Sequence, residues 1–113
     1  MTQADFEPPI QNLDAFDVLG ERKDGGIDAA IIAATPIDGS SDTLKALTTK
    51  VRNYIAELTS QQFLANYPAA RGKTRVIIMA HSAIDLAALG LIESLTKEAR
   101  DAGVELSTER VVA

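Results

Sequence analysis

The chain has 113 residues, a mass of 12.0 kDa and a net charge of −5, which fits one domain with a single core. It has no cysteine and one histidine, which excludes disulfides, thiolate catalysis, thiolate zinc sites and multi-histidine metal sites within one chain. The acidic charge balance makes nucleic-acid binding unexpected, and no apolar run is long enough to span a membrane. The N-terminus lacks a secretory pattern, so we expect a cytoplasmic, bacterial-type domain without a cofactor.

The first segment, residues 1–12, is polar and contains Pro8 and Pro9. Proline donates no backbone hydrogen bond, so we predict a flexible N-terminal arm or an extended strap here. The remainder, residues 13–113, is predicted to form a single α/β domain.

The first half of that domain is typical of a hairpin followed by a helix. Residues 14–19 alternate apolar and polar side chains, which predicts a half-buried strand, and the glycine-rich segment 20–26 predicts a turn. Residues 27–34 are apolar on both faces, as in a strand covered on two sides. A helix is predicted over 42–65, and Lys50 is expected to lie off its apolar stripe.

The second half repeats the pattern of strand and helix. Residues 75–81 predict another strand that is apolar on both faces. A helix is predicted over 83–102, and Gly103 follows it where a C-terminal glycine is common. Residues 104–108 alternate again and predict the last strand.

The element order is therefore β-β-α-β-α-β. Strands joined through a helix pair in parallel with a right-handed crossover, whereas the hairpin is antiparallel. The alternating strands suit the edges and the wholly apolar strands suit the centre. We predict an α/β two-layer sandwich: a four-stranded mixed sheet of order 1-2-3-4 with both helices on one face.

This architecture leaves one face of the sheet without helices. Aliphatic side chains of the central strands would lie there in water, which forgoes roughly 1.5–3 kcal/mol each. Either the N-terminal arm crosses this face or a second copy of the chain packs on it, so a homodimer is expected. The candidate interface residues are Ile31, Ile32, Ile77 and Met79 on the strands, with Leu86 and Leu89 on the second helix as another surface.

The local motifs, taken together, resemble a known family. The segment DVLG and a Lys/Asp/Gly/Gly turn are followed by NYIAELTSQQFLANYPAARG and finally by EARDAGVELS. From Asp14 to Thr108, this pattern is similar to a family of small bacterial α/β domains of unknown function. The resemblance implies a fold, but it implies no activity and no catalytic residues.

The carboxyl ends of the parallel strands are the usual ligand site of an open α/β sheet, and helix N-termini there favour anions. The candidate residues for a phosphate or another small polar ligand are Thr35, Asp38, Ser40, Ser41, His81 and Ser82. The simpler interpretation is helix capping, because Ser82 and Asp85 match a capping box and further polar residues precede the first helix.

Catalysis at the same edge is a weaker hypothesis. In a hydrolase, Ser40 or Ser82 could be the nucleophile and His81 the base, with Asp14 or Asp38 as the orienting group. A magnesium site could be drawn from Asp14, Asp38 and Asp85. The spacing requires neither, so we predict no catalytic residue and no metal ligand.

The opposite end of the sheet is basic. It gathers Arg22, Lys23, Arg71, Lys73, Arg75, Lys97 and Arg100, which suit an acidic partner or simply complement helix C-termini. The leading interpretation is a non-enzymatic interaction or regulatory module that self-associates as a homodimer and has an unknown protein partner. The alternative is a small-ligand or phosphate-binding domain with weak hydrolase activity.

Overall fold

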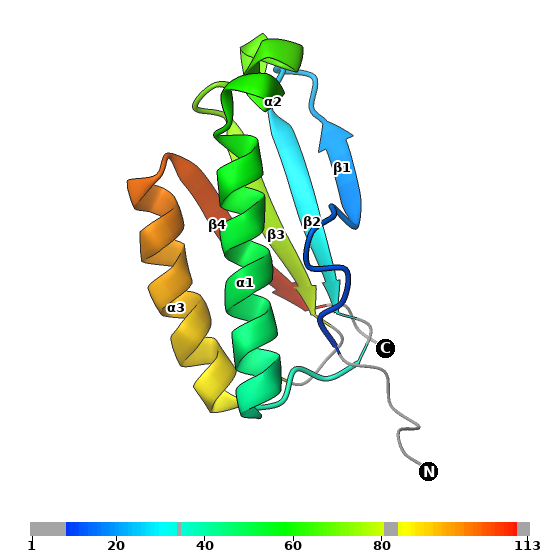
Figure 1. Cartoon of the computed structure of the whole chain (residues 1–113), viewed down its shortest axis with the longest axis vertical. Coiled ribbons are helices and arrows are strands. Elements are labelled where there is room, and N and C mark those ends of the chain that lie inside the picture. Colours follow the sequence, from blue (N-terminus) through cyan, green and yellow to red (C-terminus); the bar gives the residue numbers. More distant parts are fainter. Residues whose placement is uncertain (1–8, 34, 81–83, 111–113) are drawn as a thin grey trace.

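The computed structural model describes residues 9–33, 35–80 and 84–110. In chain order, the elements are β1 (Val18–Glu21), β2 (Ile27–Ala33), α1 (Ser41–Leu58), α2 (Gln61–Asn66), a 3-10 turn η1 (Pro68–Ala70), β3 (Thr74–Ala80), α3 (Leu86–Asp101) and β4 (Val104–Arg110). Figure 1 shows α1 and α3 side by side against one face of the sheet. The predicted α/β fold is confirmed.

The sheet has the predicted strand order β1-β2-β3-β4. Strand β1 is antiparallel to β2, and the pairs β2–β3 and β3–β4 are parallel. The tight turn after β1 is closed by the Arg22 N–H, which donates to the Gly26 carbonyl at 2.8 Å. Gly25 has a φ of 86° in that turn, a left-handed conformation that favours glycine.

The core lies between the sheet and the helices. Alternate residues of the central strands face it, namely Ile27, Ala29, Ile31 and Ala33 of β2 and Thr74, Val76, Ile78 and Ala80 of β3. Ile31, expected as an interface residue, is fully buried in this core. The reason is strand pleating, because Ile31 and Ile32 point to opposite faces. Ile32, 42% exposed, lies on the face that no described helix covers, which we call the uncovered face.

The element boundaries differ from the predicted ones where side chains compete for backbone groups. The helix expected over 42–65 is interrupted after Leu58, where Thr59 Oγ1 donates to the Ile55 carbonyl at 2.7 Å. The Ser60 side chain then accepts from the Phe63 N–H and starts α2. Similarly, α3 begins only at Leu86, because Asp85 is its N-cap.

Lys50 lies within the apolar stripe of α1, contrary to the sequence prediction. It is fully buried, and its Nζ lies 2.8 Å from both carboxylate oxygens of Asp17. The same Nζ donates to the Gln11 backbone carbonyl. Of the segment predicted as an arm, residues 9–12 are described, and Ile10 is buried in the core. The lysine therefore fastens the chain before β1 to the middle of α1.

Candidate functional site

The carboxyl edge of β2 brings two predicted ligand residues together in a helix cap. Ser40 is the N-cap of α1, and its Oγ accepts from the Thr43 N–H at 3.2 Å. This hydroxyl also donates to the Asp38 carboxylate at 2.7 Å, and the Ser40 N–H donates to that carboxylate at 3.0 Å. Hydrogen bonds from Ser40 and Thr43 lower the pKa of Asp38 below its ordinary value. Both side chains are thus engaged locally.

The loops after β2 and β3 close against each other. Ile37 and Ile84 form an isolated parallel bridge, and the Asp85 N–H donates to the Ile37 carbonyl at 2.9 Å. The Asp85 carboxylate accepts from the Ala87 N–H at 2.8 Å. A side chain at Gly39 would collide with that carboxylate, so the two loops touch with little space between them.

The other residues predicted at this edge are dispersed. Ser41 is exposed at the start of α1, and Thr35 is half-buried in the loop. His81 and Ser82 lie outside the described residues, so the predicted hydrolase set is not placed. The predicted capping box of Ser82 and Asp85 is wrong, because Asp85 is itself the N-cap of α3. The Asp14 carboxylate accepts a hydrogen bond from Asn53 Nδ2 of α1. Among residues 9–33, 35–80 and 84–110, no three histidine or acidic side chains group as metal ligands.

The uncovered face of the sheet carries side chains in three rows across the strands. Strand register places Gly20, Asp28, Arg75 and Glu105 in the first row, Val18, Ala30, Ile77 and Ser107 in the second, and Ile32, Met79 and Glu109 in the third. Val18 is 53% exposed, whereas Ile77, at the centre of the face, is 9% exposed. Ile77 is nevertheless outside the core cluster, because it points away from the helices.

One end of this face is charged and internally paired. The Asp28 carboxylate accepts from Arg75 Nη2 at 2.8 Å and from Nε at 3.1 Å, and it also pairs with Arg22. The hydrogen bonds from Arg75 and Arg22 lower the pKa of Asp28 below its ordinary value. The face therefore passes from an ionic row at the start of β2 to an apolar row near its end.

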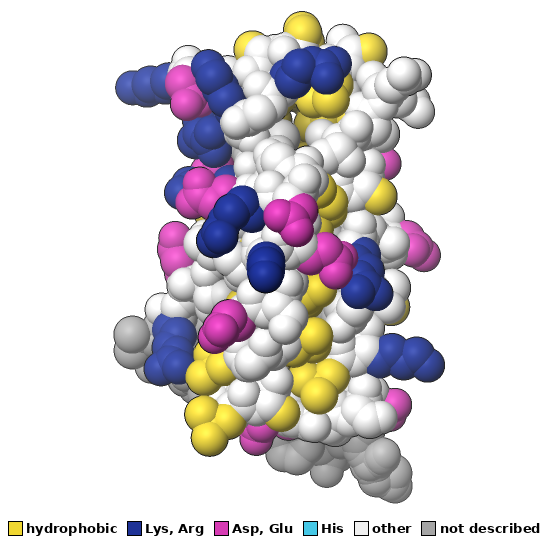
Figure 2. Space-filling view, turned by 90° about the vertical axis from the view of Figure 1, so that its left-hand side faces the viewer, with side chains coloured by type: hydrophobic (Ala, Val, Ile, Leu, Met, Phe, Trp, Pro, Cys, Tyr) yellow, Lys and Arg dark blue, Asp and Glu magenta, His cyan; other side chains and the backbone are white. Residues whose placement is uncertain are grey.

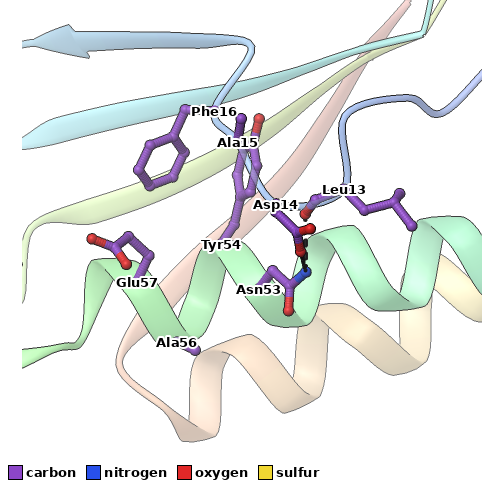
Figure 3. A pocket seen from close by; sticks show the side chains of 8 residues that line it. All are labelled: Leu13, Asp14, Ala15, Phe16, Asn53, Tyr54, Ala56 and Glu57. Carbon is purple, nitrogen blue, oxygen red and sulfur yellow. Dashed lines mark hydrogen bonds between the residues drawn. The ribbon is translucent and has the colours of Figure 1, made fainter.

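A groove separates the segment before β1 from α1. Its volume is about 550 Å³, and its lining residues are Leu13, Asp14, Ala15, Phe16, Asn53, Tyr54, Ala56 and Glu57 (Figure 3). The Phe16 and Tyr54 rings meet edge to face with centroids 4.7 Å apart. The Tyr54 hydroxyl accepts from the Asp17 N–H at 2.8 Å and donates to the Ala30 carbonyl at 3.1 Å.

Burial raises the pKa of Tyr54 to about 12, so its hydroxyl stays protonated at neutral pH and cannot serve as a general base there. Asn53 Nδ2 donates to the Leu13 carbonyl at 2.9 Å. The polar atoms of both α1 residues are thus used to hold the preceding segment in place.

The predicted basic end forms a second cavity, of about 710 Å³. Four cationic side chains line it together with Glu105, namely Arg22, Lys73, Arg75 and Arg100. Figure 2 shows basic and acidic side chains mixed toward the top, the end at which β3 begins. Since Arg22 and Arg75 share Asp28, part of this positive charge is neutralised within the chain.

A model of one protein family matches residues 9–111, nearly the whole chain. The chain belongs to the Family of unknown function (DUF6572). This family covers the segment before β1 as well as all four strands. Neither the curated proteins nor the solved structures gave a match to the chain. Within the described part of the chain, every helix is too short or too polar for a bilayer crossing.

The family therefore supplies no site residues, and the structure adds two groups that sequence reasoning missed. The Lys50–Asp17 pair joins residues 33 positions apart, and the Arg75–Asp28 pair joins residues 47 apart. A signal for the first exists: Lys50 lies between Leu47 and Val51 on the apolar side of its helix. No local pattern announces the second, which depends on strand register.

Proposed function

We propose that this protein is a non-enzymatic interaction module that associates with a second copy of itself through the uncovered face of the sheet. The observation that carries the proposal is the apolar group Val18, Ile32, Ile77 and Met79 on that face. Ile32 and Val18 are among the most exposed large apolar side chains in the described residues. Removing such a side chain from water contributes about 1.5–3 kcal/mol when burial is complete.

The composition of the face favours a protein–protein interface rather than a catalytic cleft. Its apolar centre is bordered by charged and polar side chains, among them Asp28, Arg75 and Glu109. An apolar centre with a polar rim is the common arrangement of protein interfaces. By contrast, two of the polar residues predicted at the carboxyl edge, Asp38 and Ser40, are engaged in the α1 cap.

The size of the face indicates how strong the association is. The face consists of three strands of seven residues and one of four. At about 3.3 Å per residue and about 4.8 Å between strands, these give a footprint of roughly 400 Å² per copy. Stable interfaces bury about 800 Å² per partner, so a contact of this size belongs with weak, reversible complexes. The expected behaviour is a monomer–dimer equilibrium that responds to protein concentration.

Sedimentation equilibrium over a range of concentrations tests this proposal. The wild-type chain is expected to dimerise reversibly, and Ile32→Lys to weaken the dimer at least about tenfold by placing a charge in the contact. Leu86→Lys is the matched control, because Leu86 is 83% exposed at the start of α3, on another surface.

Two results would overturn the proposal. One is a wild-type chain that remains monomeric at every concentration. The other is a dimer that Leu86→Lys disrupts and Ile32→Lys leaves intact, which would place the contact on α3. Circular dichroism of both variants establishes that each has kept the fold.

A further inference from the structure

The side-chain rows on the uncovered face are self-complementary in one orientation. Two identical faces related by a two-fold axis must have that axis in the plane between them. The axis runs either along the strands or across them. Aligned sheets in sandwiches keep their strand directions within about 30°, so both orientations are physically available.

In the first orientation, the axis runs along the strands, midway between β2 and β3. Each row then faces the same row of the second copy with its strand order reversed, so that β2 lies over β3 and β1 over β4. Asp28 then lies opposite Arg75 of the second copy, and Ala30 lies opposite its Ile77. The first contact joins opposite charges, and the second joins a small side chain to a large one. Both are favourable across an interface.

The third row agrees with this orientation. Ile32 lies opposite Met79 of the second copy, so an apolar side chain meets another. Ile32 also lines a hollow of about 370 Å³ together with Pro9 and Phe16. Methionine is unbranched and flexible, which suits it to fill an irregular hollow of this kind.

With the axis across the strands, the first and third rows would meet instead. Asp28 would lie opposite Ile32 of the second copy, and Arg75 opposite its Met79. Glu105 would lie opposite Glu109, so two carboxylates would face each other. Charges buried against apolar groups or against like charges destabilise an interface.

Resting on the proposed function, we infer that two copies pack with their strands running in the same direction, β2 over β3 and β1 over β4. The two-fold axis lies along the strands. In this arrangement Val18 of one copy lies opposite Ser107 of the other, whereas the two Val18 residues are on opposite edges of the dimer. The contact suits a second copy, because Asp28 and Arg75 exchange places when their row is reversed and so meet as opposite charges.

Site-directed cross-linking tests the arrangement, and the natural absence of cysteine makes it clean. Val18→Cys and Ser107→Cys chains of different mass are treated, separately and mixed, with a bismaleimide that spans about 10 Å, the usual distance between packed sheets. The mixture is expected to give a cross-linked pair of the two variants. Each variant alone is expected to give little cross-linked product.

The outcomes separate this inference from the proposed function. If Val18→Cys alone cross-links as efficiently as the mixture, the axis runs across the strands and the inference is wrong. If sedimentation shows a dimer but none of the three samples cross-links, the inference also fails while self-association stands. If the wild-type chain is monomeric as well, both fail.

A rescue experiment gives a second readout that needs no cross-linker. Ile32→Glu and Met79→Lys are each expected to weaken the homodimer, since each places two charges against apolar side chains. In a mixture, one contact pairs the two introduced opposite charges and the other keeps the native Ile32–Met79 contact. Recovery of dimer in the mixture, relative to either variant alone, supports the arrangement, and no recovery contradicts it.

Discussion

The two faces of the sheet are built from the same strands but are completed in different ways. The face toward α1 and α3 is almost wholly aliphatic. Among the described residues, the charged side chain buried behind it is that of Lys50, which is paired with Asp17 and donates to the Gln11 carbonyl. The other face carries the charged side chains Asp28 and Arg75 in one row and the apolar side chains of Ile32 and Met79, beside Glu109, in another. The comparison shows that the inward face is covered by helices of the same chain, whereas no described helix covers the outward face.

The largest effect on stability is expected from removing the buried charge of Lys50 on the helix-covered side of the sheet. Lys50→Met keeps the volume of the side chain but leaves Asp17, which is only 14% exposed, without its partner. The free energy of unfolding is expected to fall by about 3 kcal/mol, measured by urea denaturation. Lys45→Met, on the exposed side of α1, is the control. Equal effects of the two substitutions would contradict the structural role of the pair.

A direct comparison of the faces comes from truncating one isoleucine on each. Ile78→Ala removes a fully buried side chain and is expected to cost about 2–4 kcal/mol. Ile32→Ala is expected to cost less than about 1 kcal/mol in dilute, monomeric protein, because much of its side chain is already in water. Denaturation curves measure both. Similar losses at the two positions would mean that the outward face is covered within the monomer.

Alkaline titration tests the helix-covered side of the sheet at Tyr54 of α1, whose hydroxyl donates to the Ala30 carbonyl of β2. Its pKa is about 12 in the folded chain, against an ordinary value of 10.0. The stability that depends on the protonated hydroxyl is therefore complete below pH 10 and is lost as the pH rises toward 12. Tyr54→Phe is expected to be less stable at neutral pH and to lose less stability over this interval. A Tyr54→Phe variant that loses as much stability as the wild-type chain over this interval would contradict this account.

The smallest expected effect is a gain in stability. The Thr108 hydroxyl is buried and has no hydrogen-bond partner among the described residues. Thr108→Val removes an unsatisfied polar group with little change in shape, so the free energy of unfolding should rise by about 1 kcal/mol. Thr96→Val is the control, because Thr96 Oγ1 donates to the Ile92 carbonyl at 2.7 Å. A gain at Thr96 and none at Thr108 would contradict this account.

The architecture was predictable because it depends on local periodicity and on general rules of chain connection. Strand order followed from the helix crossovers and from the contrast between alternating and wholly apolar strands. The phase of β2 has one signal in the sequence, Asp28, because a charged side chain on the same face as Ala30 and Ile32 favours that face as the outward one. Both faces were nevertheless taken as apolar, so Ile31 was expected outside, whereas it lies in the core.

Features that depend on distant partners were beyond local patterns. Lys50 is a charged residue in sequence, and only the position of Asp17 explains its burial. The break after Leu58 depends on which hydroxyl bonds to which carbonyl, a choice that the serine and threonine run leaves open. At the carboxyl edge, the sequence predicted a group of polar residues but could not show that Ser40 and Asp38 bond to each other.

The attachment of the segment before β1 has a consequence for protein synthesis. Three side chains on neighbouring turns of α1, those of Lys50, Asn53 and Tyr54, hold this segment by hydrogen bonds to residues 33 to 40 positions earlier. A ribosome delivers the N-terminal part of a domain first. The segment must therefore wait, without its partners, until α1 has emerged and wound.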